Sequence, residues 1–295
     1  MVDLALERPV GRPSRWIAGF KRGGPRLWLG GALVGVLVLV ALTAPLLAPH
    51  NPIEQDLMSA QLPPAWIDGG QSAYLLGTDS LGRCVLSRLI YSARVAVAVA
   101  LIAASLAAAI GIAFGLVAGS FGGWVDQLTS RLIDVWMAFP PVLLSIVLAA
   151  VIGAGLTSVI AAIVVVDWTR FARVVRAETM VQLQRDYAAA ARVIGLSRGA
   201  ILRLEILPNL IPLVVTLLAV EMGIAILVEV ILSFVGISVA GDTPTWGGMI
   251  AEGRQIVYQA PWIMALPIGC IILSVIGFNL LGDGLRRALD PVQRR

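Results

Sequence analysis

Long apolar stretches alternate with shorter polar ones along most of the chain. Two of these stretches, Leu27–Ala48 and Val95–Gly119, contain no charged residue. An α-helix rises about 1.5 Å per residue, so either stretch is long enough to cross a hydrocarbon core about 30 Å thick. The first stretch is also too long for the apolar part of a cleaved signal peptide, which covers about 7–15 residues. We therefore expect two membrane-spanning helices here.

A longer apolar block, residues 136–167, is interrupted by Pro140–Pro141 and by Gly153–Ala154–Gly155. Because one crossing needs about 20 residues, the block predicts two helices that fold back at the glycines, the second continuing past Trp168. Two more apolar stretches follow, at residues 210–236 and 262–281. The pattern therefore predicts an all-α, polytopic membrane protein with six transmembrane helices.

The composition supports a bilayer as the solvent of this protein. Charged residues make up 14% of the 295 residues and the mean hydropathy is +0.89, whereas a soluble domain contains about 25% charged residues. The net charge of +4 and the isoelectric point near 9.6 would also suit a nucleic-acid-binding protein. The basic residues gather at the ends of the apolar stretches, however, which favours membrane topology and argues against nucleic acid as a partner.

The basic residues also predict the orientation. If the N-terminus is cytoplasmic, 18 of the 22 lysines and arginines lie on the cytoplasmic side, where such residues are in excess in membrane proteins. The chain then divides into a cytoplasmic N-terminal tail (1–26), a first transmembrane helix (27–48), an extracytoplasmic segment (49–94), a core with five transmembrane helices (95–284) and a cytoplasmic C-terminal tail (285–295). We expect a bacterial plasma-membrane protein with both termini inside.

One cytoplasmic segment, residues 186–209, is a polar island rich in alanine. Asp186 is a candidate N-cap for a short helix over Tyr187–Ile194, and Gly195 suits the left-handed position that ends such a helix. Ser197 is a candidate cap for a second helix that runs until Pro208. The small side chains of the first helix would let another protein backbone approach closely.

The island carries a resemblance to a known family. "AAARVIGLSRGAILRLEILP" (189–208) is similar to the E-A-A, three residues, G, nine residues, I-x-L-P pattern of ABC importer permeases. Four further segments resemble the dipeptide, oligopeptide and nickel branch of that family, second-permease type: "LGTDSLGR" (76–83), "LSRLIYSAR" (86–94), "DVWMAFPPVLLSIVLA" (134–149) and "EVILSFVGISVAGDTPTWGGMI" (229–250). The chain departs from the pattern at three positions: Ala189 replaces glutamate, Glu205 replaces isoleucine and Cys84 replaces aspartate.

The resemblance implies a type I ABC importer permease fold and a set of partners. Residues 186–195 would be the coupling helix that docks on an ATPase, with Asp186, Tyr187, Ala190, Ala191 and Gly195 as coupling residues. The implied partners are a second permease subunit, two ATPase subunits that bind ATP and magnesium, and an extracytoplasmic binding protein, which residues 49–94 would help to receive. The implied substrate is a dipeptide or oligopeptide, with a nickel complex or another small solute as alternatives.

The chain itself lacks the residues for ATP hydrolysis. A phosphate-binding loop of the G-x-x-x-x-G-K-[ST] type needs a lysine, and the only lysine, Lys21, lies in "AGFKRGG". With a single histidine, His50, which we expect at an interface, the sequence offers no His-cluster metal site, and no Ser-His-Asp, Cys-His or paired-carboxylate arrangement. Cys84 and Cys270 have no metal-like spacing and are expected to be free thiols. We therefore expect no enzyme activity and no cofactor in this chain.

Two glutamates, Glu221 and Glu229, interrupt the fifth apolar stretch. A charged group near the middle of a bilayer is costly, so each should face a bundle interior or a wet cavity. They would either line the translocation path or make structural hydrogen bonds between helices. A proton-coupled secondary transporter that uses Glu221 is the rival mechanism. Asp167, at the end of the fourth predicted helix, is expected to be an interfacial cap.

Overall fold

The computed structural model describes residues 24–237 and 243–289, and this part of the chain is helical without a β-strand. The N-terminal tail before Gly24, Lys21 and the last six residues of the C-terminal tail lie outside the described residues, as do residues 238–242. The helices are α2 (Gly24–Leu42), α3 (Ala44–Leu47), α4 (Val85–Phe121), α5 (Gly123–Met137), α6 (Pro141–Ile152), α7 (Leu156–Gln182), α8 (Asp186–Val193), α9 (Arg198–Ile201), α10 (Leu207–Phe234), α11 (Trp246–Gln255) and α12 (Pro261–Leu289), with a 3-10 turn η1 (Leu57–Ser59) and a π-helical turn η2 (Leu202–Ile206).

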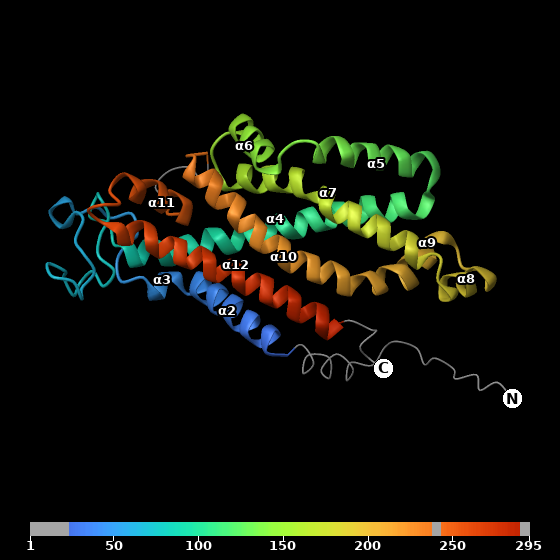
Figure 1. Ribbon diagram of the computed structural model, residues 1–295, viewed down its shortest axis with the longest axis horizontal. Helices are drawn as coiled ribbons and strands as arrows, with labels where there is room; N and C mark the ends of the chain where they lie inside the picture. The colour runs from blue at the N-terminus through green and yellow to red at the C-terminus, as the bar shows by residue number, and fades with distance from the viewer. Residues whose placement is uncertain (1–23, 238–242, 290–295) are drawn as a thin grey trace.

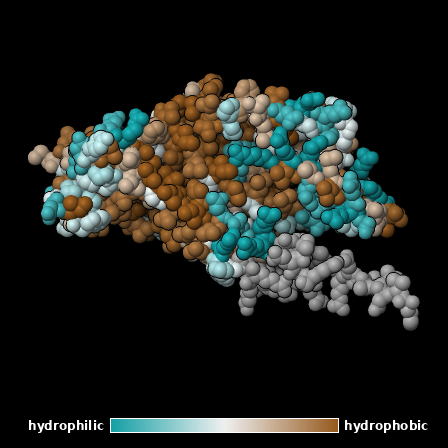
Figure 2. All heavy atoms as spheres, viewed as in Figure 1, coloured by the Kyte–Doolittle hydropathy of each residue, from teal (hydrophilic) through white to brown (hydrophobic). Residues whose placement is uncertain are grey.

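The long helices run along the long axis of the molecule (Figure 1). Helix α11 and the loop before α4 lie at one end, which we call the α11 end, and α8 and α9 lie at the other, the α8 end. In the space-filling view, hydrophobic residues gather in the middle of the visible face and hydrophilic residues at both ends (Figure 2). This banding is the surface pattern that a bilayer requires.

Four helical stretches are long and apolar enough to cross a membrane, and a fifth is added if the bent pair α5–α6 counts as one span. The four are Gly24–Leu42, Val85–Phe121, Arg198–Phe234 and Pro261–Leu289. Helix α7 has 27 residues, so it is long enough, but Asp167, Arg170 and Arg173 interrupt its apolar character. The predicted all-α class is confirmed, whereas the count of six spans stays a prediction.

The first two spans differ in their boundaries from the predicted ones. The first, predicted as Leu27–Ala48, is divided by a break at Thr43 into α2 and the short α3. The second begins at Val85, ten residues before the predicted Val95. Hydropathy marks only the lipid-embedded part of a helix, and here the polar first turns of α4 are buried against protein. The loop after α3 therefore ends at Cys84 rather than at residue 94.

The third apolar block folds back at its glycines, as predicted. Gly153 and Gly155 both have positive φ (104° and 152°) and separate α6 from α7, which continues past Trp168 to Gln182. The interruption noted at Pro140–Pro141 is a sharp bend, where α5 and α6 meet at 86°. Helix α5 is amphipathic rather than uniformly apolar, so a search for apolar stretches does not detect it.

Helices α4 and α7 approach closely along three glycines. A Cβ added at Gly111 would lie 2.4 Å from the Trp168 carbonyl oxygen, and one at Gly115 would lie 2.8 Å from that of Ala172. Gly119 meets Thr179 in the same way. Glycines four residues apart lie on one face of a helix and allow close backbone contact in membranes, where packing rather than hydrophobicity drives helix association. This α4–α7 pair is the rigid centre of the fold.

Candidate functional site

The polar island forms a helix, a turn and a second helix at the α8 end (Figure 1). Gly195 has a φ of +87°, the left-handed conformation that its position predicted. The Leu196 N–H donates to the Ala191 carbonyl at 3.1 Å and the Gly195 N–H donates to that of Arg192 at 3.0 Å. These two bonds define a Schellman motif, which satisfies the last carbonyls of α8. The Ser197 hydroxyl caps α9 by accepting from the Ala200 N–H, as predicted.

Two details of the predicted island are wrong. Arg185, not Asp186, is the N-cap residue of α8, because the N–H groups of Ala188 and Ala189 already donate to the Arg185 carbonyl. Asp186 is therefore the first helical residue, where its charge still interacts favourably with the helix dipole. Pro208 does not end the second helix. It directly follows η2, which joins α9 to α10 without a break, so the helix continues through Pro208.

The predicted coupling residues lie on two faces of α8. Asp186 and Ala190 are exposed, whereas Ala191 is 4% exposed and packs with Ala188 against the protein's own helices. Ala191 is thus placed to seat α8 on the bundle rather than to contact another protein. Beside Ala190, large apolar side chains are exposed at the end of α8 and nearby: Val193 (87%), Ile194 (77%) and Leu204 (59%). Their exposure makes this end suited to a protein contact.

Tyr187 connects α8 to α7. Its hydroxyl donates to the Gln182 side chain, whose amide donates to a Glu178 carboxylate oxygen at 2.7 Å. Burial raises the pKa of the Tyr187 phenol, so the phenol keeps its proton, and therefore its donor, across neutral pH. A displacement of α8 would be transmitted directly into α7 through this chain of hydrogen bonds.

A cluster of three charged side chains lies halfway along α7 and α10. The Arg170 Nη1 atom is 3.4 Å from both carboxylate oxygens of Glu221, and its Nη2 atom is 3.8 Å from Asp167 Oδ1. The predicted role of Asp167 as an interfacial cap is wrong, because this side chain is buried in the middle of α7. Glu221 is 1% exposed and joins two helices, as the structural interpretation requires. Its role in translocation stays a prediction.

Glu229 is also buried, one turn before Ser233 on α10. The Ser233 hydroxyl donates to a Glu229 carboxylate oxygen at 2.5 Å. This bond stays within one helix, and Glu229 has a further interaction in the structure. A buried carboxylate needs such partners to offset its lost hydration. A role for Glu229 in the translocation path remains a prediction.

A four-residue ion cluster at the α11 end was not predicted. Asp79 accepts from Arg83 Nε at 2.7 Å and also pairs with Arg88, and both arginines pair with Glu252 of α11. Asp79 additionally accepts from the backbone N–H groups of Leu81 and Arg83. The cluster fastens the loop before α4 to α11, so residues 76–88 and α11 form one rigid unit. The "LGTDSLGR" segment was recognised in the sequence. Its partner in the cluster, Glu252, was not, because Glu252 lies 164 residues beyond Arg88.

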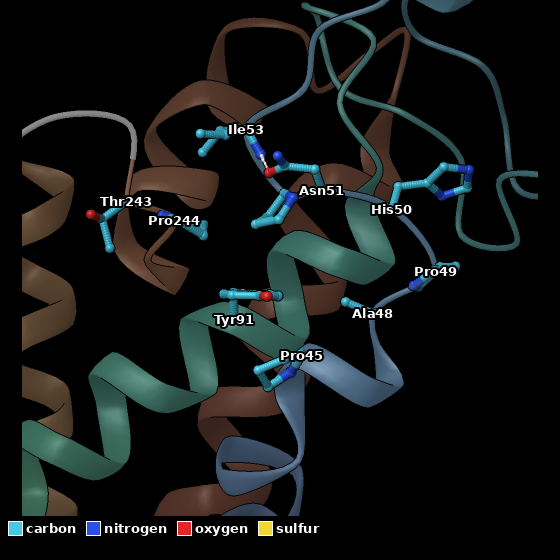
Figure 3. Close-up of a pocket in the computed structure, with 10 residues that line it drawn as sticks. Pro45, Ala48, Pro49, His50, Asn51, Ile53, Tyr91, Thr243 and Pro244 are labelled. Carbon is cyan, nitrogen blue, oxygen red and sulfur yellow. Dashed lines mark hydrogen bonds between the residues drawn. The ribbon is translucent and has the colours of Figure 1, made fainter.

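A cavity of 790 Å³ also opens at the α11 end (Figure 3). Pro45, Pro49 and Pro244 belong to its rim, and Tyr91 of α4 lies between them. The His50 ring points away from this cavity and stacks on Tyr74 at a centroid distance of 4.8 Å. His50 is half-buried within the loop, and its expected interfacial place stays a prediction. Among the described residues both cysteines are free thiols, as predicted, and no group of three His, Cys, Asp or Glu side chains could hold a metal.

Comparisons with known proteins agree on one family. Residues 111–295 match the family described as binding-protein-dependent transport system inner membrane component, and residues 25–64 match the N-terminal transmembrane domain of oligopeptide transport permease C. The chain is 40% identical to the dipeptide transport system permease protein DppC of Haemophilus influenzae over 88% of this chain and 90% of that protein. It is 39% identical to the di/tripeptide transport system permease protein DppC of Pseudomonas aeruginosa over 89% and 87%. A glutathione transport system permease protein, GsiD of Pectobacterium atrosepticum, is 36% identical over 88% and 85%.

Proposed function

Because the chain belongs to the family of binding-protein-dependent transport system inner membrane components, we propose an assignment of its helices to the steps of ATP-driven import. The chain is a multi-pass inner-membrane permease subunit of an ABC importer, as the resemblance implied. This membership decides against the proton-coupled secondary transporter. The chemical energy therefore comes from ATPase partners, and this subunit acts as a moving part rather than as an enzyme.

We propose that the substrate is a short peptide. The relatives named above carry dipeptide, di/tripeptide or glutathione transport in their names, and the similarity to each spans almost the whole chain. A nickel complex has no comparable support, since none of these three relatives carries nickel transport in its name. A binding protein outside the membrane would deliver the peptide to the α11 end.

Helix α8 is the proposed docking element for an ATPase partner. One observation carries this assignment: α8 is short, capped at Gly195 in a rigid Schellman motif, and flanked by exposed apolar side chains. When two ATPases bind ATP and magnesium and close, they would push α8. The push would reach α7 through Tyr187 and α10 through the continuous helix from Arg198 to Phe234. A second permease subunit would complete the path.

The proposed topology has six transmembrane helices with both termini in the cytoplasm. The five candidate spans are joined by α7 as the sixth, whose charged residues are matched by partners on α5 and α10 rather than facing lipid. This assignment places α8 in the cytoplasm and α11 outside, in agreement with the distribution of basic residues.

The test is ATP-dependent uptake of a radiolabelled dipeptide into proteoliposomes that contain this chain, its permease and ATPase partners and the binding protein. We expect uptake to require ATP hydrolysis and to persist when the proton gradient is collapsed. Glu221→Gln should retain substantial uptake, because the carboxylate is structural in this mechanism. Uptake that follows the proton gradient and disappears in Glu221→Gln would contradict the proposal.

A further inference from the structure

A cavity lies at the α8 end, where the ends of α4 and α7 meet α8 and α9 (Figure 1). Its volume of 340 Å³ lies inside the range of about 300–1,000 Å³ that is typical of small-ligand pockets. Among the described residues that line it, two are arginines and none carries a carboxylate. The lining includes Leu183, Leu196 and Ile201 as apolar residues, and Ser120, Arg192 and Arg198 as polar ones.

The two arginines of this cavity carry uncompensated charge. Within the part of the chain that the structure describes, neither Arg192 nor Arg198 forms an ion pair. The Arg192 Nη2 atom donates to the Leu183 carbonyl at 2.9 Å, which fixes this guanidinium at the cavity wall and uses one of its five N–H donors. Two positive charges around one cavity repel each other, and an anion between them removes the repulsion. The cavity therefore suits an anion with several acceptor oxygens, such as a phosphate group.

The cavity lies where α4 leaves the apolar part of its sequence. Ser120 directly follows the charge-free stretch 95–119. Trp124, in the first turn of α5, is exposed, and tryptophan is enriched where a membrane meets water. In the proposed orientation this is the cytoplasmic boundary, where anionic lipid headgroups attract arginine side chains.

An exposed apolar strip on α4 leads from this boundary toward the hydrophobic middle of the molecule. The strip consists of Phe114, Val117 and Phe121, which are spaced three and four residues apart and therefore share one face of the helix. Ser120 adjoins Phe121 and follows Val117 by about one turn. An acyl chain that lies along the strip would place its headgroup beside Ser120.

We propose that this cavity binds the phosphate of an anionic phospholipid from the cytoplasmic leaflet, with Arg192 and Arg198 as the phosphate ligands. The inference rests on the proposed topology, which places α8 in the cytoplasm, and it adds a lipid ligand to the proposed importer. The Ser120 hydroxyl, which donates to the Val117 carbonyl at 3.2 Å, can turn to donate to the headgroup instead. The bound lipid would join the end of α4 to α8 and α9, and so hold the proposed coupling element at the membrane surface.

An acidic segment of an ATPase partner is the other occupant to consider. On α8, Asp186, Ala190 and Val193 are spaced four and three residues apart and share the proposed docking face. Arg192 is outside this series, and its guanidinium reaches back to Leu183, directly after α7. Because Arg192 lies beside the docking face rather than on it, the lipid is favoured over the ATPase. A free phosphate offers the same oxygens as a headgroup, so the test includes inorganic phosphate.

The test measures lipid binding next to the cavity in the complete transporter, with both permease subunits and the ATPases, in phosphatidylcholine nanodiscs. Cys84 and Cys270 are replaced by alanine, and a fluorophore is attached to Val117→Cys, on the exposed strip. Nitroxide-labelled phosphatidylglycerol or nitroxide-labelled phosphatidylcholine then quenches the fluorophore. Two basic residues near a membrane surface should let phosphatidylglycerol reach half-maximal quenching at an about tenfold lower share of the lipid than phosphatidylcholine.

Two controls show whether the preference comes from the cavity. A fluorophore at Leu39→Cys, exposed on α2 and outside the lining, should be quenched equally by both lipids. Arg192→Gln combined with Arg198→Gln should remove the preference at Val117→Cys. Arg185→Gln combined with Arg203→Gln removes the same charge from exposed positions outside the lining, and should preserve the preference.

Three results would overturn the lipid site. The first is equal quenching by the two lipids in the chain that retains all four arginines. The second is a preference that disappears when inorganic phosphate replaces chloride at constant ionic strength, which would assign the cavity to a soluble anion. The third is equal quenching together with loss of ATPase copurification in the Arg192→Gln, Arg198→Gln chain, which would assign the arginines to the ATPase. ATP-dependent dipeptide uptake by the same complex is measured separately: uptake without a lipid preference contradicts only the lipid site, and a preference without uptake contradicts only the proposed function.

Discussion

At the scale of single residues, burial distinguishes the ion pairs that stabilise the fold from the exposed pairs that contribute little to its stability. Asp79 is completely buried and is met by two arginines, while Arg26 and Asp283 form a pair in which both side chains are about half exposed. Removal of one partner from a buried pair leaves an uncompensated charge, whereas exposed pairs contribute little. The two pairs should therefore respond very differently to neutralisation.

We expect Asp79→Asn to destabilise the protein by about 3–5 kcal/mol, because Arg83 and Arg88 would then share only Glu252. Arg26→Gln should cost at most about 1 kcal/mol. Thermal unfolding of the detergent-solubilised protein compares the two variants. Equal melting temperatures for both would show that the cluster at the α11 end does not stabilise the fold.

Prediction from sequence succeeded for residues whose type is determined by the local backbone conformation. It failed for residues whose position depends on partners that are distant in the sequence. Gly195 was recognisable because a helix end needs a left-handed residue. Asp167 was misplaced because α7 continues beyond it to Gln182 and because Glu221, in the same charged cluster, comes from another helix. The pairing of Arg88 with Glu252 could not be inferred for the same reason, since no local pattern links them.

At the scale of helices, close glycine contacts rather than apolar area set the core of the fold. Gly115 of α4 lies against α7, where an added Cβ would be 2.8 Å from the Ala172 carbonyl oxygen and 2.9 Å from the Arg176 backbone nitrogen. Backbone atoms cannot move aside as a flexible side chain can. A larger residue at this position must push the two helices apart.

Gly115→Leu should therefore lower the stability by about 1–3 kcal/mol or more through overpacking. Gly269→Leu on α12 is the matched control, because an added Cβ there meets no atom within 4 Å. The yield of folded protein after gel filtration, together with its melting temperature, measures the difference. A Gly115→Leu variant as stable as Gly269→Leu would contradict the close α4–α7 contact.

Helix existence was predictable, but helix ends and bends were less so. The break at Gly153–Ala154–Gly155 followed from residue type, whereas α5 escaped detection because its apolar residues follow a helical period instead of a continuous run. Pro208 was taken as a stop, yet η2 directly precedes it and the helix continues through it into α10. The local sequence could not distinguish a proline that ends a helix from one that the helix accommodates.

At the scale of the whole molecule, the proposed orientation puts α11 outside and α8 in the cytoplasm. Tyr258, after α11, is 97% exposed, and Arg203, beside α9, is also exposed. In a chain without native cysteines, Tyr258→Cys should react with a membrane-impermeant maleimide in intact cells. Arg203→Cys should react only after the cells are permeabilised. The reverse pattern would overturn the orientation.

In the proposed mechanism, transport depends on α8 acting as a rigid coupling element, and the most direct measurement compares two glycine substitutions in the reconstituted importer. Gly195→Val forces a β-branched residue into a left-handed backbone, at a cost of about 1–2 kcal/mol or more. Gly199→Val, four residues further in α9, makes the same change where φ is not positive; an added Cβ meets no atom within 4 Å at either site. ATPase copurification and binding-protein-stimulated ATP hydrolysis should fall in Gly195→Val and remain near wild type in Gly199→Val. Wild-type values of both in Gly195→Val would show that residues 186–195 are an ordinary loop and not the coupling element.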